Sequence, residues 1–203
     1  MGEQDYRILR GIAEDPDAFK ARYVKRALEY GFPRDLETSI TRGLPFNSNA
    51  RRLLDLKVEI TIVQDGRLNS DLTYMTVPGH SPGSVAFMLE RQGLLFSGDH
   101  ILERITPNIG VYEEEQDMLG EYLVSLDRVK DRGFKVCLPG HGRPFAGIGE
   151  RIDEIKEHHS LRLKEIEESC GDWSSAYTVA SKIRWNRGRH LSDMNEMERN
   201  FAF

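Results

Sequence analysis

Two histidines and an aspartate stand in glycine-rich loops beside apolar runs of the chain. His80 lies in PGHSPGS, Asp99 ends LLFSGD, and His141 lies in LPGHG. Two imidazoles and a carboxylate are a ligand set that zinc, manganese and iron all accept in proteins. Any one of these residues alone is more often a turn residue or a helix cap. Three together, each next to an apolar run, indicate a metal site.

A predicted hairpin would place His80 and Asp99 side by side. Residues 84–89 and 94–99 read as two strands joined by the short connection ERQG. If they pair as antiparallel neighbours, the start of the first strand lies beside the end of the second. A short buried strand, FKVCL, leads into the loop of His141. We therefore expect the three side chains at one edge of one sheet.

Helices alternate with these strands along the sequence. Asp15 followed by Pro16 predicts the start of a helix that ends at Gly31. The alternating VEITIV and the β-rich LTYMTV predict strands ahead of the hairpin. Apolar spacing predicts an amphipathic helix over 118–129 and a long helix over about 147–170. The pattern predicts an α/β domain built in layers.

The composition limits the classes of function. The 203 residues carry a net charge of −5, which gives no general affinity for nucleic acid or for an anionic membrane. No apolar run approaches the ~20 residues of a membrane span. The polar start MGEQDYR is no secretory signal, and the two cysteines do not form a disulfide framework. We expect a cytoplasmic protein without membrane or nucleic-acid partners. The sequence leaves homo-oligomerisation open.

The loop motifs resemble those of a known family. PGHSPGS, LLFSGDH and LPGHG look like the last three metal motifs of the metallo-β-lactamase-fold hydrolases, with the glyoxalase II-like and ribonuclease-like members nearest in style. The resemblance runs from about Met1 to Trp185. It implies that His80 ligates a first metal, that Asp99 bridges two metals, and that His141 ligates the second.

The same resemblance implies a cofactor and a reaction. The cofactor would be zinc, as two ions in the intact family, with manganese or iron as alternatives. The reaction would be attack of metal-activated water on an ester, thioester or phosphodiester, with a small-molecule ester or thioester as the expected partner.

One part of the family pattern is absent from the chain. The leading motif His-x-His-x-Asp-His does not occur, and no histidine precedes His80. We therefore expect residues 1–170 to form an N-terminally incomplete metallo-β-lactamase-like domain, the C-terminal half of an αββα sandwich. Residues 171–203 would begin a helical, winged-helix-like tail. A catalytic general base is not assigned, activity is expected to be weak or absent, and Asp99 with His141 should be the better remaining pair of ligands.

Alternative interpretations remain beside the metal site. His158 and His159 are adjacent on the long predicted helix, and adjacent helix residues do not share a face. A solvated helix with His159 turned inward is therefore favoured over a metal pair. For function, the alternatives are a metal-free domain that binds a partner or a nucleotide, and a nucleic-acid processing hydrolase, which the tail would suit. Metal in the purified protein would argue against the first of these.

Overall fold

The computed structural model describes residues 1–34, 52, 54–55, 59–112, 116–185, 188–195 and 198–199. The chain forms two compact units, Met1–Ile8 with Val58–His159, and Leu9–Lys57 with Ser160–Phe203. The three candidate ligands all belong to the first unit. The domain boundary predicted at residue 170 stays a prediction.

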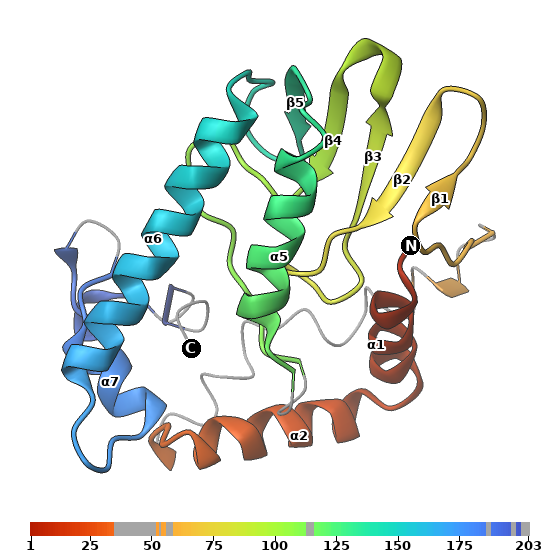
Figure 1. The fold of residues 1–203 in the computed structure, drawn as a ribbon. Coiled ribbons are helices and arrows are strands. Elements are labelled where there is room, and N and C mark those ends of the chain that lie inside the picture. The colour runs from red at the N-terminus through yellow and green to blue at the C-terminus, as the bar shows by residue number, and fades with distance from the viewer. Residues whose placement is uncertain are drawn as a thin grey trace. The chain divides into compact units, whose positions relative to one another are not determined.

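A single five-stranded sheet runs through the first unit, in the order β1-β2-β3-β4-β5 (Figure 1). Strands β1 to β4 are antiparallel neighbours, whereas β4 and β5 are parallel. The carboxyl ends of β4 and β5 therefore meet at the same edge, which is also the edge where β3 begins. The strands span Gly66–Arg67, Leu72–Thr76, Val85–Leu89, Leu94–Gly98 and Val136–Pro139.

Two helices cover one face of this sheet. Helix α5, Met118–Lys130, begins at Asp117, whose carboxylate accepts a hydrogen bond from the Gly120 amide. Helix α6, Ile148–Ser169, contributes its first half to the same unit. Alternate strand residues point toward these helices and are almost fully buried, so one continuous core forms between them. Its members are Met75, Val77, Ala86, Met88, Leu95, Ile101, Tyr122, Leu126, Val129, Cys137, Ile148, Ile152 and Ile155.

The other face of the sheet carries a row of partly exposed aromatic side chains. Tyr74, Phe87 and Phe96 stand opposite one another in three neighbouring strands. Phe96 keeps 39% of its surface exposed. The core of the unit thus lies on the helical side of the sheet.

The second unit is helical in its described part. Helix α2, Pro16–Glu29, is capped by the side chain of Asp15, and the short helix α7, Ala176–Lys182, is capped by Ser175. Helix α1, Glu3–Glu14, passes from the first unit into the second. Single 3-10 turns follow at η2, Glu90–Gln92, in the first unit and at η4, Leu191–Asp193, in the second.

Most of the predicted elements are present. The α/β class, the hairpin, the helix after Asp15 and the two later amphipathic helices are confirmed. The strand predicted from VEITIV is wrong for its described residues, because only Val63 pairs, in an isolated bridge with Gly2. The bonds around this bridge run from the Val63 amide to the Met1 carbonyl and from the terminal amine to the Thr61 carbonyl. Within the described residues, no helix is long and apolar enough to cross a membrane.

Candidate metal centre

The loops of the three candidate ligands meet at the edge where β4 and β5 end. Asp99 directly follows β4, and His141 follows β5 by one residue. The Gly140 amide donates to the Gly98 carbonyl at 2.7 Å, which holds the two loops together. A Cβ atom at position 140 would lie 2.6 Å from Asp99 Oδ1. A side chain at position 140 would therefore push against the Asp99 carboxylate.

The Asp99 carboxylate presents one oxygen to each histidine. Asp99 Oδ2 lies 3.9 Å from His80 Nε2, and Asp99 Oδ1 lies 3.5 Å from His141 Nε2. Two ligand atoms that each bind one ion at ~2.1 Å in tetrahedral geometry lie ~3.4 Å apart. Both separations are close to this value, and both fall within the ~5 Å expected for ligands of one centre.

One of these oxygens lacks a hydrogen bond although it is buried. Asp99 Oδ1 has no hydrogen-bond partner in the described structure. A carboxylate oxygen removed from water without a partner is unfavourable, and a cation is the partner that its charge favours. The donor set and this orphaned oxygen therefore fit a metal ion.

The ligands form two pairs and no closed cage. In the described part of the chain, no three His, Cys, Asp or Glu side chains are grouped so that they could hold one ion between them. Instead, His80 and His141 each face a different oxygen of the shared Asp99. In this arrangement Asp99 would be the ligand that the two histidines share.

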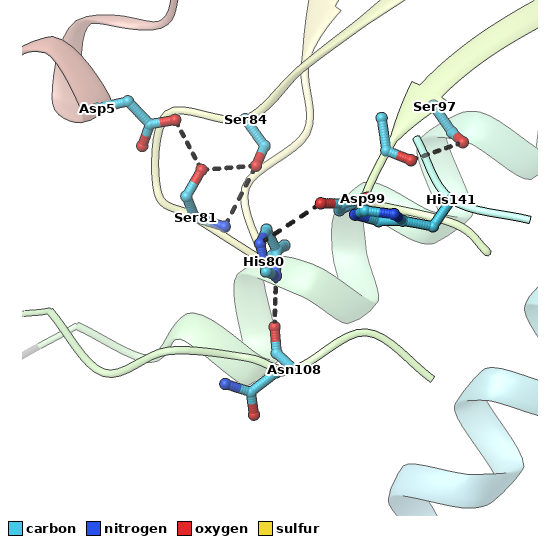
Figure 2. Close-up of polar contacts among 9 residues, drawn as sticks. Asp5, His80, Ser81, Ser84, Ser97, Asp99, Asn108 and His141 are labelled. Carbon is cyan, nitrogen blue, oxygen red and sulfur yellow. Dashed lines mark hydrogen bonds and ion pairs between the residues drawn. The ribbon is translucent and has the colours of Figure 1, made fainter. Parts of the chain in front are cut away.

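A backbone carbonyl orients the ring of His80. Figure 2 shows His80 between the Asn108 carbonyl on one side and Asp99 on the other. His80 Nδ1 lies 2.9 Å from that carbonyl oxygen, which can only accept, so Nδ1 carries the proton. Nε2 is then the ring nitrogen that faces Asp99. This is the usual way in which a metal-binding histidine is fixed in one tautomer.

The loop after His80 is attached to the first helix. Asp5 in α1 accepts a hydrogen bond from Ser81 Oγ at 2.7 Å (Figure 2). It accepts another from the Gly83 amide at 2.8 Å. The Ser81 hydroxyl also contacts Ser84 Oγ at 2.7 Å. Asp5 thus holds the segment 81–84, which directly follows His80.

A neutral, buried histidine adjoins Asp99. His100 is 1% exposed, and burial, aided by the nearby His80, lowers the pKa of its imidazole to about 3. Tyr122 Oη donates to the His100 carbonyl at 2.9 Å, and the two rings meet edge to face. The His100 ring therefore belongs to the packing beneath the site.

The histidine pair on α6 lies elsewhere. His159 is half-buried with its ring edge to face against Tyr122, whereas His158 is exposed. Burial, with a smaller effect of His158, lowers the pKa of His159 to about 4. The inward position of His159 agrees with the favoured interpretation from the sequence.

Sequence reasoning did not find the groups that support the ligands. These are the Asp5 carboxylate, the Asn108 carbonyl, and Tyr122 and Ser125 of α5. Asp5 acts 76 residues away from Ser81, and a backbone carbonyl carries no residue signature. The apolar spacing of α5 marks the buried position of Tyr122, but it does not reveal what the hydroxyl contacts.

Known proteins resemble this chain in sequence and in fold. Beta-lactamase-like protein 2 homolog of Caenorhabditis elegans is 35% identical over 47% of this chain and 30% of its own length. An atrochrysone carboxyl ACP thioesterase of Aspergillus fumigatus is 24% identical over 58% of this chain and 38% of its own. The matched stretches thus span about a third of these two relatives.

Two solved structures share the fold. A metallo-beta-lactamase family protein of Thermus thermophilus superposes with a TM-score of 0.73 at 27% identity, over all of this chain and 61% of that one. A beta-lactamase domain protein of Burkholderia ambifaria gives 0.57 at 31% identity, over 71% of this chain and 42% of that one. Residues 12–141 match the sequence profile of the metallo-beta-lactamase superfamily. The chain belongs to the metallo-beta-lactamase superfamily.

Proposed function

We propose that His80, Asp99 and His141 are metal ligands of a hydrolase site, of which this chain carries one part. The observation that carries this proposal is the shared Asp99 carboxylate, which faces a different histidine with each of its oxygens at 3.9 and 3.5 Å. The orphaned Asp99 Oδ1 and the oriented ring of His80 support it.

The residues of the chain have distinct tasks at this site. A divalent ion bound here would supply Lewis acidity for the substrate oxygen and would make a bound water more acidic. Asp99 contributes the negative charge that attracts cations, while the hydrogen bond of His80 to Asn108 orients its Nε2 toward Asp99. His141, with 73% of its side chain exposed, stands on the solvent side.

We propose a small-molecule ester or thioester as the substrate. The name of the Aspergillus fumigatus relative, a thioesterase, supports a thioester, and the net charge of −5 does not favour a nucleic acid. Zinc is the proposed ion, with manganese or iron as alternatives, because a mixed imidazole and carboxylate set accepts all three. The cytoplasmic location and the oligomeric state stay predictions of the sequence.

Activity of these residues alone should be weak or absent. The chain offers three ligands, and it has no histidine before His80 that could add another from that side. The His-x-His-x-Asp-His motif that completes the site in the resembling family is not in this sequence. We therefore expect thioester turnover by residues 1–203 with zinc to be no faster than that of Asp99→Ala.

Zinc titration followed by NMR of the histidine rings tests the metal site directly. The ring signals of His80 and His141, assigned from single variants, should shift as Zn²⁺ is added, while that of His190 in the second unit should not. Asp99→Ala should weaken this binding at least about tenfold at both rings, because it removes the shared ligand. Asp172→Ala, an exposed aspartate of the second unit, is the matched control.

Two results would contradict the proposal. Unchanged ring signals at millimolar zinc would favour the metal-free binding domain. Equal binding by Asp99→Ala and Asp172→Ala would show that the ion binds elsewhere.

A nucleic-acid processing activity would require that single-stranded or duplex oligonucleotides bind to the chain despite its net negative charge. A gel-shift titration at low salt measures this binding.

A further inference from the structure

A buried hydroxyl on α5 connects the loop of His80 with the residue beside Asp99. Ser125 is 1% exposed. Its Oγ lies 2.8 Å from the Pro78 carbonyl, two residues before His80, and 3.3 Å from His100 Nε2, one residue after Asp99. The sequence separations are 47 and 25 residues, so one atom joins two distant segments. Both segments carry a proposed ligand.

The hydrogen-bonding capacity of the serine fixes how these contacts are made. A hydroxyl has one proton to donate, and carbonyl oxygens can only accept. Ser125 Oγ therefore donates either to the Pro78 carbonyl or to the Tyr122 carbonyl, which lies 2.9 Å away. Since its proton is used, its contact with His100 requires that Nε2–H of the imidazole donates to Oγ. His100 Nε2 then carries a proton, and its buried Nδ1 has no hydrogen-bond partner in the described structure.

Tyr122, one helical turn before Ser125, strengthens the same connection. Its hydroxyl donates to the His100 carbonyl at 2.9 Å, while its ring lies under the His80 loop. A Cβ atom at Gly79 would lie 2.2 Å from Tyr122 Cδ2, so ring and loop are in close contact. The same face of α5 thus contacts the backbone before His80 and the backbone after Asp99.

We propose that Ser125 is a positioning residue that, through Pro78 and His100, sets the separation between His80 and Asp99. The inference rests on the proposed metal site and adds how the site is held. Ser125 contacts neither ligand side chain in the described structure, so its effect must pass through the two loops. If Ser125 only stabilised α5, the hydrogen bond to the Tyr122 carbonyl would be enough. Contacts with both loops would not be needed.

Two measurements on Ser125→Ala test this role. Zinc affinity, from the ring titration, should fall about tenfold, the lower end of the effect of removing a group that orients a ligand. Amide hydrogen exchange without metal should become faster at residues 77–81 and 98–101 and stay unchanged in β2 and β3. Ser125→Cys, which preserves most of the volume but bonds weakly, should resemble Ser125→Ala. A partial recovery in Ser125→Thr would support the role of the hydroxyl.

Val129→Ala is the matched control on the same helix. Val129 is 1% exposed, belongs to the same core, and makes no side-chain hydrogen bond to either loop. Val129→Ala should lower the unfolding midpoint at least as much as Ser125→Ala does, and it should change zinc affinity less than about twofold. Equal zinc affinity in Ser125→Ala and wild type would overturn the inference, as would equal losses in Ser125→Ala and Val129→Ala.

The two measurements separate this inference from the proposed function. If the wild-type chain bound no zinc, the metal proposal would fail, and the inference that rests on it would fall with it. If the wild type binds zinc and Ser125→Ala binds it equally well, only the inference fails. Faster exchange at both loops together with lower zinc affinity supports both.

Discussion

Two loops of the proposed site carry the same kind of ligand but are held very differently. They are the His80 loop, residues 77–84, and the His141 loop, residues 139–145. The ring of His80 is fixed by the Asn108 carbonyl, and its loop is attached to Asp5 and to Ser125. In the described part of the chain, the ring of His141 meets no polar partner besides Asp99 Oδ1. The exposed side-chain fractions, 42% and 73%, follow the same order.

One half of the proposed site is therefore preorganised, whereas the other half is open. A ligand that already points toward its ion loses less side-chain freedom on binding than one that must be ordered. The family resemblance favours Asp99 with His141 as the better remaining pair. The contacts around His80 favour the opposite order, with His80 and Asp99 as the more rigid corner of the site.

Replacing a glycine by alanine in each loop should give the greatest contrast between the two loops, in the free energy of unfolding. Gly79 has φ +155°, and a Cβ atom added to it would lie 2.2 Å from the Tyr122 ring. Gly142 has φ +90°, and a Cβ atom added there would meet only Glu103, at 3.7 Å or more. Gly79→Ala should lower the free energy of unfolding by roughly 3 kcal/mol or more, from overpacking and backbone strain together. Gly142→Ala should lower it by about 1 kcal/mol, from strain alone.

Urea unfolding of the two glycine variants, without metal, measures this difference. Gly133→Ala, at φ +65° with no atom within 4 Å of the added Cβ, is the control for strain without packing. It should behave like Gly142→Ala. Equal losses at positions 79 and 142 would mean that the His80 loop is not the more tightly packed of the two.

A smaller effect is expected when the ligands themselves are removed. Because His80 is oriented in advance, His80→Ala should weaken zinc binding about tenfold more than His141→Ala does. Isothermal titration of both variants with Zn²⁺ in one buffer gives the ratio, with His190→Ala of the second unit as the control. A larger loss in His141→Ala would restore the order that the family resemblance favours.

The sequence located the three loops of the proposed ligands, but it did not reveal the contacts that hold these loops. His80, Asp99 and His141 lie in short motifs beside apolar runs. The predicted hairpin places the first two at one edge, and the parallel pairing of β4 with β5 brings His141 to the same edge. Asp5 was not predicted to act there, since helix α1 was not identified and its contact with Ser81 depends on the tertiary fold. In its described residues, the strand expected from VEITIV is reduced to one bridge, between Val63 and Gly2. Local patterns indicate elements, whereas the support of a site comes from residues distant in sequence.

The smallest expected effect concerns pH and involves neither ligand loop directly. Burial against Tyr122, with a smaller contribution of the neighbouring His158, lowers the pKa of His159 from 6.5 to about 4. Between these values the unfolded chain binds a proton that the folded chain does not, so stability falls as the pH falls from 6.5 toward 4. His159→Gln should remove this contribution, below about 1 kcal/mol because the ring is only half-buried.

Urea unfolding at pH 7.5 and pH 5, in the presence of a chelator, measures this contribution. The loss of stability between the two pH values should be smaller in His159→Gln than in the wild type, while His190→Gln should lose as much as the wild type. Some dependence should remain, because the pKa of buried His100 is lowered in the same direction. An unchanged pH dependence in His159→Gln would mean that its ring is protonated in the folded chain. Tyr122 would then not be packed between two neutral imidazoles, that of His159 on α6 and that of His100 beside Asp99. Part of the evidence that Tyr122 supports the His80 loop would be lost.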